Sequence, residues 1–300
     1  MSHVLLAGAS GFLGTHLRAA LTARGHDVTA LVRRPARGTG ESTWDPYAGT
    51  LDRDVVGAAD VVVNLAGAPT LGNPHSATWA RELRESRVTT TRVLAEAIAT
   101  SDRRPAFLAG NGISYYGDRS DEGDPVLDEQ AGSRGDALRT SVTREWQAAA
   151  QPAADAGARL CVLRTAPVMD RRSEPLKQLR LLFLAGLGGR LGDGGQRMPM
   201  ISLHDWVGAV VHLAEHEDAS GPFNLCCPRT PTNAEFTEAL ARALHRPKFA
   251  TVPRFALKVG AGRMAPELLG SLNVVPAALE ASGYVFRDPD VGAVLEAGLS

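Results

Sequence analysis

The stretch Val4-Leu5-Leu6-Ala7-Gly8-Ala9-Ser10-Gly11-Phe12-Leu13-Gly14 decides the fold of this chain. Its first four residues form a short apolar run, which predicts a buried β-strand. The glycines predict a sharp turn, and Leu17 and Leu21 then share one face of a helix that Gly25 ends. This order predicts one strand, one turn and one helix packed as a unit.

The same alternation of strand and helix continues along the chain. It predicts an α/β fold with a Rossmann-like doubly wound parallel sheet. Short apolar runs predict further strands, and longer stretches with helical periodicity separate them. The expected strands cover residues 27–32, 60–65, 106–109 and 159–163, and the expected helices include 81–99, 136–154 and 233–244.

The character of the sequence changes after Arg164, and this change predicts a second, smaller unit. A basic and apolar stretch, residues 176–184, leads into the glycine-rich residues 186–195, which is typical of a lid over a ligand. The expected boundaries are 1–165 with about 204–228 for a Rossmann domain, and about 166–203 (the lid) with 229–300 for a small C-terminal α/β substrate domain.

The composition favours a globular protein that binds a small molecule. Of the 300 residues, 44% are hydrophobic, which is enough for a sizeable core. The 32 basic and 33 acidic residues leave a formal net charge of -1 without a block of one sign, which argues against a nucleic acid or a membrane as partner. Because the first residues lack a secretory signal and no apolar run could span a bilayer, we expect a cytoplasmic location.

The reactive side chains outside the opening stretch indicate no metal site. Cys161, Cys226 and Cys227 are too few for a disulfide framework and lack the spaced partners of a zinc site, so we expect reduced, structural cysteines. The acidic pairs Asp121-Glu122 and Asp128-Glu129 lie in polar, loop-like sequence. We expect these pairs to be solvated rather than to act as an acid and a base.

The glycine spacing of the opening stretch predicts a dinucleotide site. It allows a sharp turn, a close backbone approach to a pyrophosphate, and tight packing of the helix on the sheet. The helix N-terminus offers free N–H groups and the positive end of its dipole to the phosphates. A merely tight turn is the alternative, but the loop has the strand before it and the helix after it that such a site requires. The expected contacts are Gly8, Ser10, Gly11, Phe12, Leu13 and Gly14.

The end of the second expected strand indicates which dinucleotide binds. NAD-selective proteins place a carboxylate there, about 20 residues past the last glycine, against the ribose 2'-hydroxyl. This chain has Arg33 and Arg34 instead. Guanidinium groups form charge-assisted bonds to a 2'-phosphate, which a carboxylate would repel, so the pair predicts NADP(H). A solvated pair of arginines is the alternative interpretation.

With these residues in view, the chain resembles the atypical extended short-chain dehydrogenases/reductases, and among them an NAD(P)-dependent epimerase-like family with a distinctive C-terminal domain. No single motif is specific, but together the motifs span nearly the whole chain. The segments that carry the likeness are residues 8–14, Trp44-Asp45-Pro46, Asn64-Leu65-Ala66-Gly67, Ser86-Arg87 with the threonines that follow, Tyr115-Tyr116-Gly117, residues 186–195, His204-Asp205-Trp206 and the tail around Arg246-Pro247.

The resemblance implies roles for several of these segments. Trp44 or Asp45 would lie near the adenine, and Asn64-Leu65-Ala66-Gly67 would close over the central part of the cofactor. Arg164-Thr165-Ala166-Pro167 would approach the nicotinamide end. Asn111 stands where relatives usually carry an active-site serine, and its amide could still hydrogen-bond a substrate carbonyl or hydroxyl. A homodimer formed through helices beside the sheet is a further implication.

Some of these residues also have a purely structural interpretation. Asn64 and Asp205 can satisfy backbone groups at a strand end and at a helix start, and for Asp205 we favour helix capping. Tyr115 and Tyr116 can both be packing residues, or one can be core and the other face the site. The four tryptophans favour the core, with Trp44 as the exception if it meets the adenine.

The residue pair that usually performs hydride-transfer chemistry in this superfamily is absent. That pair is a tyrosine acid/base and, four residues later, a lysine that lowers its pKa and holds the ribose. The helix that should carry this pair, residues 136–151, contains neither a tyrosine nor a lysine. Arg139 and Thr143 stand at about the positions of the pair. Arginine is a poor proton shuttle because its pKa stays above about 12. A proton would therefore have to come from Tyr115, from Tyr116 or from the substrate itself.

Two functions of different class follow from these observations. The first is an NADP(H)-dependent oxidoreductase or epimerase-like enzyme that acts on a small polar substrate, which the cofactor loop and the lid support. The second is a non-catalytic NADP(H)-binding protein with a regulatory or sensing role, to which the missing pair points. Some members of the resembling family are linked to cell division rather than to a reaction. We favour the enzyme because a lid over a cofactor suits turnover.

Overall fold

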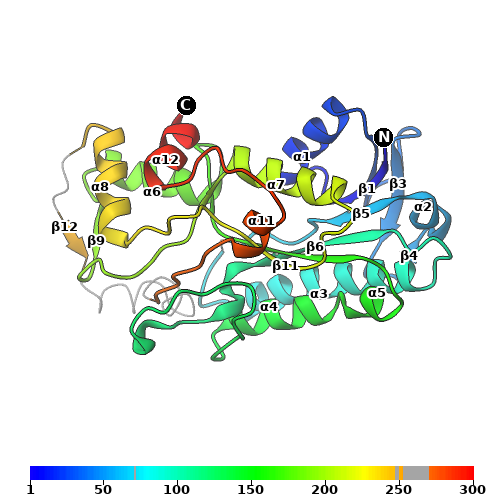
Figure 1. The fold of residues 1–300 in the computed structure, drawn as a ribbon, viewed down its shortest axis with the longest axis horizontal. Coiled ribbons are helices and arrows are strands. Elements are labelled where there is room, and N and C mark those ends of the chain that lie inside the picture. Colours follow the sequence, from blue (N-terminus) through cyan, green and yellow to red (C-terminus); the bar gives the residue numbers. More distant parts are fainter. Residues whose placement is uncertain (71, 247–249, 253–269) are drawn as a thin grey trace.

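The computed structural model describes residues 1–70, 72–246, 250–252 and 270–300 (Figure 1). Pro247, which belongs to the tail segment named above, lies outside the described residues. An eight-stranded sheet forms the centre of the molecule, and helices cover both of its faces. The predicted doubly wound α/β fold is therefore confirmed.

The sheet has the strand order β11-β7-β6-β5-β1-β2-β3-β4. Every neighbouring pair is parallel except β3 and β4, which are antiparallel. Strand order reverses beside β1, so the carboxyl ends of β1 and β5 border the crevice in which such sheets bind ligands. The strands are β1 (His3–Ala7), β2 (Asp27–Val32), β3 (Glu41–Asp45), β4 (Thr50–Leu51), β5 (Val61–Asn64), β6 (Ala106–Gly112), β7 (Leu160–Thr165) and β11 (Gly221–Leu225).

The two faces of the sheet are covered by separate helical layers (Figure 1). On one face, Leu17 and Leu21 pack in the same buried cluster as Trp206. On the other face, Leu94 and Ile98 pack with the apolar side chains of β5 and β6. The first layer contains α1 (Phe12–Ala23) and α7 (Leu203–Glu215), and the second contains α2 (Arg53–Ala58), α3 (Ala77–Ala99), α4 (Leu138–Ala148) and α5 (Gln151–Asp155).

Two elements differ from the sequence prediction for physical reasons. The helix expected at 136–154 is divided into α4 and α5, because Pro152 lacks an N–H and can stand only in the first turn of a new helix. Strand β6 continues past the apolar run to Gly112, because its glycine-containing end pairs with Leu163–Thr165 of β7. This extension carries Asn111 to the carboxyl edge of the sheet.

A second core lies beyond the carboxyl ends of the strands, at the left of Figure 1. Leu176 and Phe183 pack there with Phe236, Leu240 and Leu295. Residues from the expected lid and from the expected C-terminal unit thus share one core, while the exact domain boundaries stay a prediction. The elements of this region are β8 (Val168–Met169), α6 (Glu174–Leu184), β9 (Gly189–Leu191), β10 (Ile201–Ser202), α8 (Asn233–Ala243), β12 (Ala250–Val252) and α12 (Val291–Leu299). Helix α11 (Ala277–Ala281) lies instead beside β11, and its Leu279 packs in the same cluster as Trp206.

The glycine-rich residues 186–195 are more regular than a loop. They contain β9, which pairs in parallel with β12, and β8 pairs in the same way with β10. Within the described ranges, no helix combines the length and apolar character that crossing a membrane would need.

Candidate functional site

The glycine loop between β1 and α1 is packed too tightly for side chains. Gly8 has φ +80°, a left-handed conformation that favours glycine, and a Cβ there would lie 2.6 Å from the carbonyl carbon of Leu65. A Cβ on Gly14 would lie 2.1 Å from the carbonyl oxygen of Gly8. The backbone N–H of Gly11 donates to that same oxygen at 3.0 Å. The loop therefore has the tight turn and close helix packing that the glycine spacing predicts.

The N-terminus of α1 is open for an anion. Gly11 is the N-cap residue, so no side chain there accepts from the free N–H groups, and the first turn contains no acidic residue. Ser10 and Gly11 are both exposed. The free N–H groups and the positive end of the helix dipole thus face solvent with no competing carboxylate. This donor set fits the diphosphate of a dinucleotide.

The loop after β5 lies against the glycine loop. Gly8 lies so close to the backbone of Leu65 and Ala66 that a Cβ on Gly8 would be 2.8 Å from the nitrogen of Ala66. Asn64 fixes the start of this loop, because its Oδ1 accepts from the backbone N–H of Ala66 at 3.0 Å and its Nδ2 donates to Thr91 Oγ1 at 2.8 Å. The structural interpretation of Asn64 is thereby confirmed, and Leu65-Ala66-Gly67 lies where it would border a cofactor held by the glycine loop.

The two arginines after β2 are not equivalent. Arg34 forms a two-pronged ion pair with Glu41, with its Nη2 2.6 Å from Oε1 and its Nη1 2.7 Å from Oε2. The Arg34 hydrogen bond lowers the pKa of Glu41 to about 2. Arg33 is exposed and binds no other residue in the described part of the chain. Arg33 is therefore the guanidinium that is available to a 2'-phosphate, whereas Arg34 already has an anionic partner.

The segment expected near the adenine has structural roles in this fold. Trp44 is 2% exposed and packs in the core on the face of the sheet that α3 covers. The carboxylate of Asp45 accepts from the backbone N–H groups of Tyr47 at 2.9 Å and Ala48 at 3.2 Å, which fixes the turn between β3 and β4. Neither role requires a ligand, so contact between this segment and the adenine stays a prediction.

The tryptophans divide between the core and half-buried positions. Trp206 is fully buried, as the core interpretation expects. Trp79 and Trp146 are half-buried, so they lie at the edge of the core rather than inside it. The indole N–H of Trp146 donates to Thr91 at 2.8 Å, which joins α4 to α3.

Arg164 at the end of β7 organises a buried polar network. It is 2% exposed, and its guanidinium lies 3.7 Å from the ring centroid of Tyr115. Its Nη1 donates to the Tyr116 hydroxyl at 2.8 Å, and its Nη2 donates to Gln147 Oε1 at 3.1 Å. The contact between Arg164 and Tyr115 has cation-π geometry. Arg164 thus holds both tyrosines near the carboxyl edge of the sheet.

The two tyrosines differ in what their hydroxyls can do. Tyr116 is fully buried, and its hydroxyl donates to Asn224 Oδ1 at 2.7 Å while it accepts from Arg164. Burial raises the pKa of Tyr116 to about 12. Tyr115 is half-buried, and among the described residues its hydroxyl has no hydrogen-bond partner. Tyr115 is therefore the tyrosine whose hydroxyl is available to a ligand.

Glu129 contradicts the expectation that both acidic pairs are solvated. It is 6% exposed, and its two carboxylate oxygens accept from the backbone N–H groups of Asn224 at 2.9 Å and Ala278 at 3.0 Å. Burial raises its pKa above the usual value. Asp121 and Glu122 are exposed and pair with Arg134, as expected for a solvated pair.

Asn111 and the two residues at the expected catalytic positions join β6 and α4. Asn111 is 4% exposed, its Nδ2 donates to the carbonyl of Thr143 at 3.1 Å, and its Oδ1 accepts from the N–H of Gly112 at 2.7 Å. Thr143 donates its hydroxyl hydrogen to the carbonyl of Arg139 at 2.9 Å. Arg139 reaches the loop after β5, where its Nη2 donates to the carbonyl of Thr70 at 2.9 Å. A substrate contact by Asn111 stays a prediction, and it would compete with these two backbone bonds.

The residues after Arg164 lie beside α7. Thr165 is half-buried, and its Oγ1 accepts from the indole N–H of Trp206 at 3.2 Å. Ala166 is buried, and its N–H donates to the carbonyl of Leu225 at 3.0 Å. Pro167 is exposed. Contact of this segment with a nicotinamide stays a prediction.

Arg87 is a buried cation for which the sequence predicts no role in the site. It lies on α3, is 7% exposed, and donates to the carbonyls of Leu83 and Ala68, each at 3.0 Å. Burial lowers its pKa to about 10, and the nearby charge of Arg139 adds to that shift. The helical period could have predicted the burial of Arg87, because Arg87 and Leu94 share the inward face of the helix.

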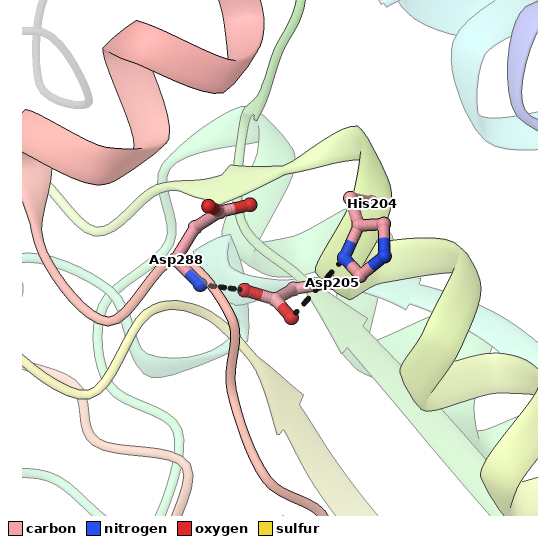
Figure 2. A group of neighbouring side chains, drawn as sticks. All are labelled: His204, Asp205 and Asp288. Carbon is pink, nitrogen blue, oxygen red and sulfur yellow. Dashed lines mark hydrogen bonds and ion pairs between the residues drawn. The ribbon is translucent and has the colours of Figure 1, made fainter.

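Asp205 connects α7 to the C-terminal segment rather than capping its helix (Figure 2). The cap is Ser202, whose Oγ accepts from the N–H of Asp205 at 3.1 Å, so the capping prediction is wrong. The fully buried Asp205 carboxylate accepts from the N–H groups of Arg287 at 2.9 Å and Asp288 at 2.7 Å. It also accepts from the Tyr284 hydroxyl at 3.0 Å. Its oxygens are thus occupied by protein donors.

The cysteines are free and buried, as expected. Burial raises the pKa of Cys161 to about 11 and that of Cys227 to about 12, and it raises the pKa of Cys226 well above the usual value. The thiolate, which is the reactive form, is therefore disfavoured at all three positions.

Two family models match the chain. That of the NAD dependent epimerase/dehydratase family matches residues 4–226, and a domain of unknown function, DUF1731, matches residues 252–297. An epimerase family protein of Mycobacterium leprae is 38% identical over 293 residues, which cover 97% of this chain and 94% of the relative. The human epimerase family protein SDR39U1 is 35% identical, with 98% of both chains covered.

Solved structures agree with these sequence matches. A crystal structure of the human epimerase family protein with NADPH has a TM-score of 0.87 and 33% identity, and it covers 99% of this chain and 98% of its own. A nucleoside-diphosphate sugar epimerase from Corynebacterium glutamicum has a TM-score of 0.81 and 32% identity, with 99% of this chain and 58% of that one covered. These similarities extend across both cores described above.

Proposed function

The chain belongs to the NAD dependent epimerase/dehydratase family, and from that premise we propose that it binds NADP(H) and acts as an epimerase-like enzyme or oxidoreductase on a small polar substrate. The observation that carries the cofactor is the open N-terminus of α1 behind a glycine loop, together with the exposed guanidinium of Arg33. The human relative was crystallised with NADPH, which supports the same choice.

Each part of the proposed site has a distinct task. The N–H groups at the start of α1 hold the diphosphate, and Arg33 binds the 2'-phosphate. Leu65-Ala66-Gly67 borders the middle of the cofactor. When bound, the nicotinamide donates or accepts a hydride at a substrate carbon.

Tyr115 is the residue best placed to move a proton. Hydride transfer to a carbonyl leaves a negative oxygen, which needs a proton from a nearby acid. The Tyr115 hydroxyl has no partner among the described residues, and the Arg164 guanidinium lies 3.7 Å from its ring centroid. A positive charge there stabilises the phenolate that remains after the proton has left. Tyr116 is excluded from this task because its hydroxyl is buried and bonded on both sides.

One observation favours the alternative, a non-catalytic NADP(H)-binding protein with a sensing role. Arg139 and Thr143 replace the usual tyrosine and lysine, and both bind backbone carbonyls. A protein that only binds the cofactor needs the glycine loop and Arg33 but no proton donor. A cytoplasmic location and a homodimer remain parts of the proposal.

Turnover distinguishes the two functions. Purified protein is incubated with NADPH and with carbonyl compounds or nucleoside diphosphate sugars, and the nicotinamide absorbance is followed. Because an epimerase returns its cofactor unchanged, the products are also separated by chromatography. We expect turnover that Tyr115→Phe reduces about 100-fold or more, while Tyr47→Phe, at an exposed tyrosine, leaves it unchanged. Tight NADPH binding with no product from any substrate supports the non-catalytic alternative.

A further inference from the structure

Arg87 is a buried positive charge without a negative partner in the part of the chain that the structure describes. Its side chain enters the junction between α3, α4 and the loop after β5, where it is 7% exposed. Its hydrogen-bond acceptors are the carbonyls of Leu83 and Ala68, and the hydroxyl of Ser86 at 3.5 Å. None of these groups carries a charge. The acceptors orient the guanidinium but leave its net charge uncompensated.

Such an arrangement is unfavourable unless an anion comes close. A buried charge loses its hydration, and neutral acceptors restore only part of what is lost. The second guanidinium of Arg139 is near enough to lower the pKa of Arg87 further, yet that pKa stays at about 10. Arg87 therefore remains charged at neutral pH. The site favours a ligand that carries negative charge or several hydrogen-bond acceptors.

The position of Arg87 relates it to the cofactor loop. A Cβ on Gly67 would lie 3.3 Å from the Arg87 Cζ, so the guanidinium contacts the loop after β5. The same loop contacts Gly8 through the backbone of Leu65. The segment Leu65-Ala66-Gly67 thus lies between the Arg87 guanidinium and the glycine loop. A dinucleotide bound at the glycine loop would pass beside that segment.

The same position relates Arg87 to the missing lysine. Its Cζ lies 5.2 Å from the ring centroid of Trp146, one turn of α4 after Thr143. Thr143 stands where the lysine of the usual pair would be. Arg87 therefore approaches from α3 the region that the lysine would reach from α4. This region adjoins β5 and β6, whereas Arg33 follows β2 on the other side of β1.

We propose that Arg87 is a positioning residue that binds the nicotinamide-ribose half of the cofactor and replaces from α3 the positive charge that the lysine usually supplies from α4. This inference rests on the NADP(H) binding proposed above. The guanidinium would donate to the ribose hydroxyls or to oxygens of the phosphate on the nicotinamide side, for which its fork of N–H groups is suited. Since arginine keeps its proton, Arg87 holds the ribose without acting as an acid.

The test compares two probes that share the adenine half of the cofactor. NADPH contains the nicotinamide ribose, and 2',5'-ADP lacks it but keeps the 2'-phosphate. Affinities for both are measured by calorimetry with Arg87→Gln, Arg87→Lys and the control Arg92→Gln, which changes an exposed arginine on the same helix. We expect Arg87→Gln to weaken NADPH binding about ten- to a hundredfold and to leave 2',5'-ADP binding within about twofold. Arg87→Lys should recover part of the loss, and Arg92→Gln should resemble the unmodified protein.

Other results would overturn the inference. If Arg87→Gln binds NADPH as tightly as the unmodified protein, Arg87 does not contact the cofactor. Equal losses for NADPH and 2',5'-ADP would show that Arg87 only maintains the shape of the loop. A lysine variant no better than the glutamine variant would exclude a role for the charge. A different result would contradict the proposed function itself: the unmodified protein would bind neither NADPH nor 2',5'-ADP.

Discussion

The glycine loop and the inward face of α4 lie at the same edge of one sheet, but they differ in how far they follow the superfamily pattern. The glycine loop is fixed by backbone contacts so close that Gly8 and Gly14 have no room for a Cβ. The α4 face keeps its helix but has Arg139 and Thr143 where a tyrosine and a lysine are usual. One region retains the cofactor geometry, and the other has lost the usual acid and its cationic neighbour.

If the proposed function holds, cofactor binding and proton transfer depend on separate parts of this fold. Backbone geometry at the loop sets how a diphosphate is held, and it allows almost no substitution. Side chains set the chemistry at α4, and neighbouring elements can supply them instead. In the proposal above, Tyr115 in the turn after β6 and Arg87 on α3 would take these tasks.

Gly14→Ala should have the largest effect on the cofactor side. The added methyl would lie 2.1 Å from the carbonyl oxygen of Gly8, so either α1 or the loop must move. We expect NADPH affinity to fall about 100-fold or more, measured by nicotinamide fluorescence. Gly132→Ala is the matched control, because a Cβ there meets no atom within 4 Å. Unchanged NADPH binding in Gly14→Ala would show that the cofactor does not use this loop.

Arg33→Asp should have the next largest effect, and it separates the two arginines. It replaces a free guanidinium by a charge that repels the 2'-phosphate, so NADPH affinity should fall about tenfold or more while NADH affinity changes little. Arg34→Asp should cost less, because Arg34 is already bound to Glu41. The ratio of the two dissociation constants is measured for each variant. A larger loss in Arg34→Asp than in Arg33→Asp would reverse our assignment.

Tyr116→Phe should act on stability rather than on proton transfer. Its hydroxyl bridges Arg164 and Asn224 in the interior, and removing it leaves both buried groups short of a partner. We expect the free energy of unfolding to fall by about 1 to 3 kcal/mol in urea denaturation. Tyr115→Phe, whose hydroxyl has no described partner, should leave stability nearly unchanged. A larger loss of stability in Tyr115→Phe than in Tyr116→Phe would contradict the structural role of Tyr116.

Glu41→Gln should have the smallest effect and the opposite sign. The change removes the carboxylate that occupies Arg34 and takes a negative charge away from the expected 2'-phosphate site. NADPH affinity should rise about two- to threefold, as expected for one ion pair near the surface, and the gain should shrink at high salt. Calorimetry at two salt concentrations measures it. A loss of NADPH affinity in this variant would show that the ion pair helps to build the site.

The sequence predicted the fold well because local patterns determine it. The apolar run before Gly8, the glycine spacing and the amphipathic helix each indicate the same unit, and the structure contains it with β2 at the predicted residues 27–32. Prediction was weaker where contacts between distant segments decide. The burial of Glu129 depends on N–H groups of Asn224 and Ala278, which are far away along the chain. No local pattern reports such partners.

The sequence identifies several residues that gather at the site, but it does not assign their individual roles. Arg33 and Arg34 were found together, but only the ion pair to Glu41 separates them. Tyr115 and Tyr116 are adjacent in sequence, yet their side chains point to different surroundings, and burial assigns their hydroxyls to different tasks. Asp205 was expected to cap its own helix, whereas it binds backbone groups more than 80 residues later.

The relative affinity of the unmodified protein for NADPH and NADH shows whether Arg33 selects the 2'-phosphate. Both dissociation constants are measured by calorimetry at one salt concentration, since the 2'-phosphate contact is electrostatic. An open α1 N-terminus with Arg33 free beside it predicts that NADPH binds about tenfold or more tightly than NADH. Equal affinities, or a preference for NADH, would contradict a 2'-phosphate site at Arg33.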